Sequence, residues 1–191
     1  MSDSTRRQVT ELLTAASDGD SDALDRLLPL LYSELHELAH RQRRRQSTSA
    51  TLNTTALLHE AYEKMARVDG AYASRVHFFR VAAQAMRQIL VDYARRYLAE
   101  KRGGGNRAGT FEEGVFAVEK RSEEILALDE ALDELEEMSP RQAEVVKLRY
   151  YAGFSLEETA DLMDLSASTV WREWAAARAW LQQELSSDPP E

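Results

Sequence analysis

Residues 155–181 carry the feature that most restricts the fold of this chain, because they contain two short helical patterns with very few residues between them. The first pattern covers 156–163, with Ser155 as a candidate N-cap and a glutamate three residues later, which is the spacing of a capping box. Ser166 can cap a second helix, so only two residues remain for the connection. The spacing predicts a helix-turn-helix.

The second of these helices has an apolar face and a polar face. Val170 and Trp174 lie on the side that returns to the core, whereas the opposite face carries Ser168, Thr169, Trp171 and Arg172, with Arg178 further along. A helix of this kind can lie in the major groove of DNA, where hydroxyl and guanidinium groups reach base edges and phosphates. Two short helices joined by a tight turn also occur in bundles that do not bind DNA. Asp164 stands where such motifs usually place glycine, and aspartate tolerates the left-handed conformation better than most residues.

The distribution of charge favours a nucleic-acid partner more than the net charge does. A net charge of −9 argues against binding to phosphates. However, residues 1–107 contain 17 basic and 13 acidic side chains, whereas residues 108–191 contain 7 and 20. Eleven of the carboxylates lie within 111–138. We therefore expect a basic N-terminal domain, an acidic connector over 111–138 and a nearly neutral helix-turn-helix part over 139–185, which has 5 basic and 7 acidic residues.

The composition also excludes several classes of protein. The chain has no cysteine, which excludes disulfides and thiolate metal sites and fits a reducing compartment. The N-terminus leads into a polar segment and not into the apolar run of a signal peptide. The densest apolar stretch, residues 27–32, is too short to span a membrane and contains Pro29. We expect a cytoplasmic protein with no membrane partner.

Helical periodicity recurs along the chain, and strand-like alternation is absent, so the expected fold class is all-α. Helices are expected over 9–17, from a cap at Ser21 or Asp22 onwards, over 56–65, over 77–102, from about Ser122, and again after Ser139 and Pro140 as cap and first-turn proline. Three glycines and then a weakly periodic acidic segment predict a flexible linker. The expected organisation is two small helical domains, 1–102 and 122–185, joined by a flexible acidic linker over 103–121.

The helix expected over 77–102 carries a stripe of cations interleaved with aromatic residues. Its cations are Arg80, Arg87, Arg95, Arg96, Lys101 and Arg102. A solvated helix face is the simpler explanation, but the near absence of acid favours a surface that faces phosphates.

A short motif in the second helix allows one enzymatic alternative. His36, Glu37 and His40 form the H-E-x-x-H pattern of zinc metalloproteases. The histidines lie off the leucine stripe, on the side that leads to a cluster of arginines, and no third ligand follows. We therefore expect no metal, no cofactor and no catalytic residue, and we keep a zinc hydrolase as a remote alternative.

Four stretches, in their order along the chain, resemble the extracytoplasmic-function (ECF) sigma factors, the minimal form of the bacterial sigma-70 family. They are TTALLHEAY at 54–62, HFFRVAAQAMRQILVDYARR at 77–96, KRGGG at 101–105 and ARAWL at 177–181. The resemblance covers roughly residues 20–185. It implies a region 2-like domain over 1–102, a region 4-like domain over 122–185, and a linker that threads the polymerase towards the RNA exit path.

The resemblance also implies partners and contact residues. The partners would be core RNA polymerase, through its β′ and β subunits, and promoter DNA, and an anti-sigma factor is a further candidate. Leu58, His59, Glu60 and Glu63 would bind core polymerase. Tyr72, Phe79, Arg80, Arg87, Tyr93, Arg95 and Arg96 would open the minus-ten element and capture a flipped base, which needs cations for the backbone and aromatic groups for the base. Ser168, Thr169, Trp171, Arg172 and Arg178 would read the minus-thirty-five element.

Two positions depart from the wider family. Glu173 and Ala176 stand where arginines are common, which implies low affinity at minus thirty-five and poor DNA binding by the free protein. The remaining alternative is a stand-alone helix-turn-helix regulator, which would bind duplex DNA without polymerase.

Overall fold

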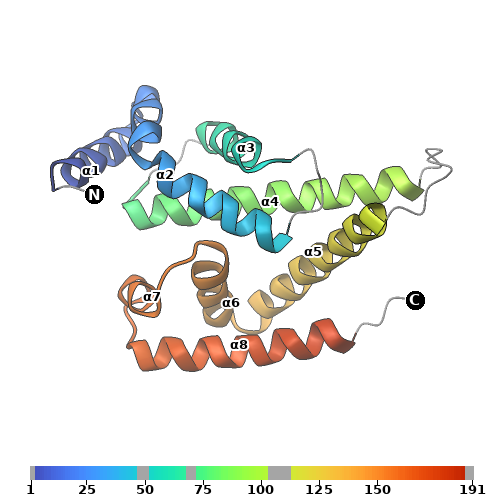
Figure 1. The fold of residues 1–191 in the computed structure, drawn as a ribbon. Helices are drawn as coiled ribbons and strands as arrows, with labels where there is room; N and C mark the ends of the chain where they lie inside the picture. The colour runs from blue at the N-terminus through green and yellow to red at the C-terminus, as the bar shows by residue number, and fades with distance from the viewer. Residues whose placement is uncertain (1–2, 47–51, 68–71, 103–112, 188–191) are drawn as a thin grey trace. The chain divides into compact units, whose positions relative to one another are not determined.

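A computed structural model describes residues 3–46, 52–67, 72–102 and 113–187 of the chain. Within these segments all regular structure is helical and no strand occurs, as the sequence predicts. The helices are α1 (Asp3–Ser17), α2 (Ser21–Gln46), α3 (Thr54–Ala66), α4 (Arg75–Arg102), α5 (Glu113–Met138), α6 (Pro140–Val146), a π-helical segment (Lys147–Tyr151), α7 (Leu156–Met163) and α8 (Ala167–Ser187) (Figure 1). None of the described helices has the length and apolarity needed to cross a membrane.

The chain divides into two compact units, and the division falls inside α4. The first unit comprises Met1–Arg44 and Leu52–Ile89, and the second comprises Arg45–Thr51 and Leu90–Glu191. The sequence assigned the whole of α4 to the first domain. The structure instead groups its C-terminal part with α5, because Val91 packs with Ile125 in one buried cluster of the second unit.

The first unit is built on a leucine stripe along α2. Leu27, Leu31 and Leu38 are fully buried, together with residues of the other three helices such as Val9, Leu57 and Phe78. One buried polar contact joins α2 to α4, since Gln42 Nε2 donates to the carbonyl oxygen of Ala83 at 3.1 Å. Periodicity predicted the leucines, whereas no sequence signal pointed to Gln42.

The N-cap that the sequence predicted for α2 is wrong. The carboxylate of Asp20 accepts the N–H of Asp22 at 3.0 Å, so Asp20 caps α2 in place of Ser21 or Asp22. Gly19 has a φ of 94°, which glycine adopts without the penalty of a side chain, and this lets the chain turn sharply between the two helices.

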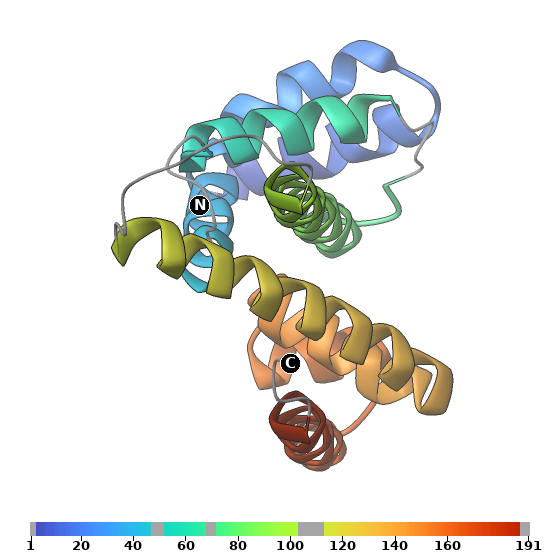
Figure 2. The same ribbon diagram turned by 90° about the vertical axis from the view of Figure 1, so that its right-hand side faces the viewer.

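The second unit is organised around α8. Its buried residues Val170, Ala177 and Leu181 recur at helical spacing, and α5, α6 and α7 pack against α8 from one side (Figures 1 and 2). Leu132 and Leu135 bring α5 into this core and Val145 brings α6, and all three side chains are almost inaccessible to solvent. Val170, which the sequence places on the core side, is buried, whereas Trp174, expected on the same side, is half-buried.

The expected flexible linker over 103–121 is wrong for its second part. Residues 113–121 belong to α5, which begins nine residues before the expected start at Ser122. One tertiary contact supports this extension, because Lys101 of α4 pairs with Glu119. Within α5 itself, the hydroxyl of Ser122 donates to the carbonyl oxygen of Val118 at 2.8 Å. Residues 103–112, including the predicted glycine hinge, lie outside the described residues.

The segment between α5 and α7 also differs in detail from the expectation. Ser139 takes the N-cap position before Pro140, but its side chain makes no capping hydrogen bond. After α6 the backbone widens into a π-helical turn, in which the N–H of Ala152 reaches the carbonyl oxygen of Lys147 at 3.0 Å. Gly153, with a φ of 78°, ends this segment as predicted.

Candidate polymerase and nucleic-acid interfaces

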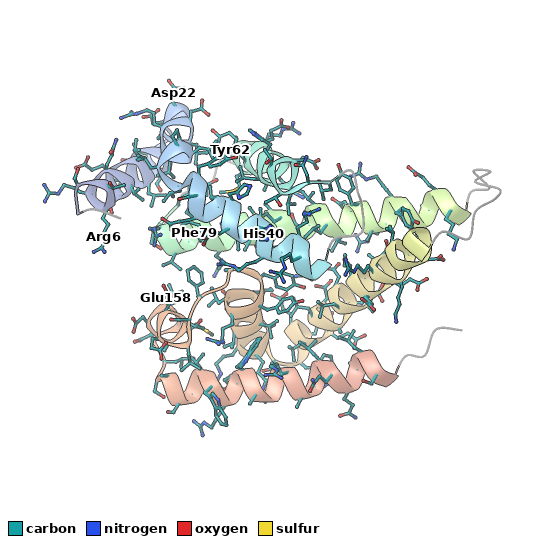
Figure 3. The ribbon with its side chains drawn as sticks, viewed as in Figure 1. Arg6, Asp22, His40, Tyr62, Phe79 and Glu158 are labelled. Carbon is teal, nitrogen blue, oxygen red and sulfur yellow. The ribbon has the colours of Figure 1, made fainter. Side chains whose placement is uncertain are left out.

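The predicted capping box at the start of the helix-turn-helix is present. The hydroxyl of Ser155 accepts the N–H of Glu158 at 3.1 Å, and the N–H of Ser155 donates to the Glu158 carboxylate at 2.7 Å. Two backbone donors that a helix leaves without partners are thereby satisfied. Figure 3 labels Glu158 on α7. Local hydrogen bonds of this kind explain why the sequence alone located α7 to the residue.

The turn between α7 and α8 uses aspartate in a left-handed conformation, as the sequence predicted. Asp164 has φ 52° and ψ 47°, and the N–H of Leu165 donates to the carbonyl oxygen of Ala160 at 3.0 Å. Below the turn, Ala160 and Val170 pack with Val145 in a buried cluster. The angle between the two helices is therefore set by a small residue on α7 and a buried valine on α8.

The N-terminus of α8 is held by a network of hydroxyl groups. Ser166 Oγ accepts the N–H of Thr169 at 3.1 Å, and it lies 2.9 Å from the hydroxyl of Ser168 and 2.8 Å from that of Thr169. Arg172 Nη2 lies 3.5 Å from Thr169 Oγ1, so the guanidinium is oriented by the same network. These groups are held close together at the positions from which a recognition helix contacts bases.

The five residues predicted to read DNA all lie on α8, and four of them are exposed. Ser168, Trp171, Arg172 and Arg178 are exposed, and Thr169 is half-buried. The indole of Trp171 has 60% of its area exposed, which is high for so large an apolar group. The structure thus brings the predicted residues together on one helix.

Glu173 anchors the recognition helix to its support, a role that the sequence did not reveal. Its side chain is only 16% exposed and pairs with Arg141 Nε at 3.0 Å, while Gln142 Nε2 donates to its other oxygen at 3.2 Å. The sequence showed only that Glu173 stands at a position where arginine is common in the wider family. The pairing of residues 32 positions apart gives no local signal, so it could not be found from spacing.

A second contact across this unit joins the π-helical segment to α8. The guanidinium of Arg149 lies over the ring of Trp174, 5.3 Å from its centre. The rings of Tyr150 and Tyr151 meet edge to face at 5.0 Å. The π-helical segment therefore places one cation, Arg149, against α8.

In the first unit, α3 presents part of the predicted polymerase surface. His59 and Glu63 are exposed and Glu60 is half-buried. Leu58, which was predicted to bind polymerase, is not part of this surface, because it is 1% exposed and belongs to the core that fixes α3. The helix is capped by Asn53, whose side chain accepts the N–H of Ala56 at 2.8 Å, so α3 begins two residues before the expected start at residue 56.

Two of the predicted base-capturing aromatics are core residues. Tyr72 is buried and its hydroxyl donates to the carbonyl oxygen of Met65 at 3.2 Å, and burial raises the pKa of its phenol. Phe79, labelled on α4 in Figure 3, is also buried, with its ring 5.7 Å from that of Phe78 and the Arg75 guanidinium 5.1 Å from its centre. The resemblance implied a DNA contact for both side chains, but both are buried in the core.

The basic stripe on α4 is partly neutralised by α5. Arg95 pairs with Asp129 at 3.4 Å and Lys101 pairs with Glu119. Arg80 and Arg96 are exposed, Arg87 is half-buried, and the Arg96 guanidinium lies 4.4 Å from the centre of the half-buried Tyr93 ring. The stripe thus combines exposed cations with one aromatic ring, whereas the guanidinium of Arg95 is paired with the carboxylate of Asp129 on α5.

A model of ECF sigma factors matches residues 6–187, which is nearly the whole chain. The chain belongs to the ECF sigma factor family. The family consists of sigma factors, which are not enzymes and which act with RNA polymerase at promoter DNA. No curated protein and no solved structure matches the chain.

The H-E-x-x-H motif of this sigma factor has a structural explanation. His36 is half-buried and stacks on Tyr32 with ring centres 5.9 Å apart, and His40, labelled on α2 in Figure 3, is exposed. In the described segments no three side chains of the ligand type gather to hold a metal ion. The family, which is not enzymatic, excludes the zinc hydrolase.

One tyrosine in this sigma factor is held by a carboxylate. The hydroxyl of Tyr62 on α3 donates to the carboxylate of Asp25 on α2. Burial, followed by this hydrogen bond and the negative charge of Asp25, raises the pKa of Tyr62 well above its ordinary value of about 10. The contact fixes the helix that carries His59 and Glu63.

Proposed function

We propose that this sigma factor binds core RNA polymerase through α3 and selects promoters through α4 and α8. Residues 1–102 would act as region 2, and the helix-turn-helix would act as region 4. RNA polymerase works on the chromosome, so the proposal places the protein in the cytoplasm.

Support for the polymerase contact comes from the two sides of α3. Leu57, Leu58 and Met65 are buried and fix the helix, whereas His59 and Glu63 face solvent. Among the described residues, Glu63 pairs with Arg67 one turn later, at 3.3 Å and with both side chains largely exposed, so its carboxylate contributes little to folding. It can therefore be exchanged for a partner's cation on the clamp of the β′ subunit.

At the minus-ten element, we assign the backbone contacts to Arg80, Arg87 and Arg96 of α4. The unstacked base would lie against Tyr93, which is half-exposed and already has a cation over its ring. Stacking on an aromatic ring is worth about 1–3 kcal/mol per base and suits a single strand. Because Tyr72 and Phe79 are buried, their rings are not assigned to this contact.

The observation that carries the proposal is the hydroxyl network at the N-terminus of α8. Ser166, Thr169 and Arg172 are already ordered in the free protein, so little side-chain entropy is lost when they meet DNA. Capping α8 requires only Ser166, whereas the exposed network also includes Ser168 and Arg172. We therefore assign minus-thirty-five recognition to this end of α8.

The first test is binding of the purified chain to core polymerase, with and without promoter DNA. We expect one-to-one binding to core, and DNA affinity only in that complex. Glu63→Lys should weaken core binding, whereas Glu37→Lys, at an exposed position of α2, is the matched control and should not. Failure to bind core, together with specific duplex binding by the free chain, would show a stand-alone regulator instead.

The second test separates base contacts from phosphate contacts at minus thirty-five. Arg172→Ala should weaken the matched element by about 1–3 kcal/mol if the guanidinium reads a base. Gln182→Ala, exposed on the same helix nearly three turns later, is the control. Equal losses on matched and scrambled elements would limit Arg172 to phosphate binding.

A further inference from the structure

Trp171 is the most exposed of the large apolar side chains in the described residues. Its exposed fraction is 60%, and the others above one third are Met138, Leu185 and Tyr32. An exposed indole leaves a large apolar surface in water, which the fold could have avoided with a polar residue at this position. Trp171 lies on the helix that we assign to the minus-thirty-five element, so its exposed indole can contact DNA.

The backbone beneath Trp171 is rigid. Val170 next to it is fully buried, and the hydroxyl network of Ser166 fixes the helix one turn earlier. The indole itself makes no hydrogen bond within the described residues. Its direction is therefore set by the helix, and its N–H remains available to a ligand.

The neighbours of Trp171 on the exposed face of α8 allow close approach to DNA. At helical spacing, Ser168, Ala175 and Ala179 form a row of small exposed residues along this face. Trp171 lies on one side of the row and Arg172 on the other. A major groove can receive such a helix deeply, and the two large side chains would then reach base edges on either side.

The chemistry of an indole matches one base better than the other three. It offers an apolar face and a single donor, and it has no acceptor. Thymine presents in the major groove an acceptor, O4, beside its C5 methyl group, whereas cytosine presents an amino donor at the same place, and guanine and adenine lack the methyl group. Apolar contact with the methyl group and donation to O4 therefore favour thymine.

We propose that Trp171 is a specificity-determining residue that selects a thymine within the minus-thirty-five element. The inference rests on the proposed function and adds the identity of one base. It requires that Trp171 faces DNA in the holoenzyme and not a polymerase subunit.

Modified bases test the two contacts separately. In a promoter that the holoenzyme uses, each thymine of the minus-thirty-five element is replaced singly by uracil, which lacks only the methyl group, or by 5-methylcytosine, which keeps the methyl group but carries an amino donor in place of O4. For the wild-type protein we expect one position at which uracil weakens holoenzyme binding by about fourfold, the value of one buried methyl-sized group. At that position 5-methylcytosine should weaken binding further.

Two variants of Trp171 connect these losses to the indole. Trp171→Ala should bind thymine and uracil at that position equally, and Trp171→Phe should still prefer thymine to uracil but should discriminate less against 5-methylcytosine. Met138→Ala, at an equally exposed position of α5, is the control and should retain both preferences.

The outcomes separate the inference from the proposed function. If the holoenzyme selects promoters but no thymine is sensitive to uracil, or if the sensitivity persists in Trp171→Ala, the inference is wrong. Weaker binding of Trp171→Ala to core polymerase without DNA would place Trp171 at a protein interface and also overturn it. If the chain neither binds core nor directs promoter binding, the proposed function itself fails.

Discussion

Replacing Glu173 by alanine should loosen the recognition helix from its support. The carboxylate is 16% exposed, pairs with Arg141 at 3.0 Å and accepts from Gln142 at 3.2 Å. Two unit charges about 4 Å apart attract by about 4 kcal/mol at an effective dielectric constant of 20. The side chain of Arg141 is 60% exposed, however, so solvent screens most of this attraction. We expect a coupling energy of about 0.5–1 kcal/mol between the two side chains.

Glu173→Ala alone should cost more than this coupling energy. It removes the ion pair and also leaves the amide of Gln142 without its acceptor, so we expect a loss of about 1–2 kcal/mol in the free energy of unfolding. Arg141→Ala should cost less, because the exposed guanidinium leaves Glu173 with Gln142 as a remaining donor. The double variant should cost less than the sum of the two single variants by the coupling energy.

Tryptophan fluorescence isolates the unit that contains this ion pair. All three tryptophans of the chain, Trp171, Trp174 and Trp180, belong to α8, so a urea titration followed by their emission reports the second unit alone. Four proteins complete the cycle: wild type, the two single variants and the double variant. The control is the surface pair of Glu63 and Arg67, measured by circular dichroism, with a coupling of about 0.5 kcal/mol or less.

The cycle can refute the reasoning directly. A coupling energy of less than about 0.3 kcal/mol, which is the usual error of additivity, would show that Arg141 and Glu173 do not stabilise each other in solution. If the pair also fixes the angle of α8, Glu173→Gln should fold but should lose affinity for the minus-thirty-five element in the holoenzyme.

Three further predictions concern the ends of α7 and the contact of Tyr62 with Asp25. Ser155→Ala removes the capping box and should lower the free energy of unfolding by about 1 kcal/mol in the same fluorescence assay; an unchanged urea midpoint would contradict the role of the cap. Asp164→Gly relieves the left-handed strain at the turn and should raise the free energy of unfolding by about 0.5–1 kcal/mol, whereas a loss of stability would show that the aspartate side chain itself supports the turn. The folded pKa of Tyr62 is raised, so its contact with Asp25 stabilises the protein below the unfolded pKa of about 10 and is lost as the pH rises above that value. The stability difference between wild type and Tyr62→Phe, measured by circular dichroism from pH 8 to 11, should therefore shrink with rising pH, and a constant difference would contradict the assignment.

Features set by local hydrogen bonds could be predicted from the sequence, and features set by distant contacts could not. Ser155, Asp164 and Ser166 act on backbone groups within a few residues, so their spacing was enough to locate the helix-turn-helix. The early start of α5 depends on Glu119 meeting Lys101 of another helix, and composition alone made the same segment resemble a linker. Asn53 was missed because two threonines beside it are also good N-terminal residues.

In the candidate site, too, residues set by local periodicity could be predicted and residues set by packing between helices could not. The polar face of α8 follows from helical periodicity, so Ser168, Trp171 and Arg172 were found. Tyr72 and Phe79 were misassigned because the sequence does not say whether an aromatic residue at the start of a basic helix faces inward. Burial in this first unit depends on packing between helices, which the spacing of residues along one helix does not show.

The π-helical segment Lys147–Tyr151 has a consequence for how related chains should be aligned. Its hydrogen bond from Ala152 to Lys147 encloses one residue more than an α-helical turn does. Removing a single residue here would restore an ordinary turn and could leave α6 and α7 each intact, whereas the same deletion inside either helix would rotate half of its core face by about 100°. Length differences of one residue among relatives should therefore accumulate at this position, and a gap placed there keeps the recognition helices in register.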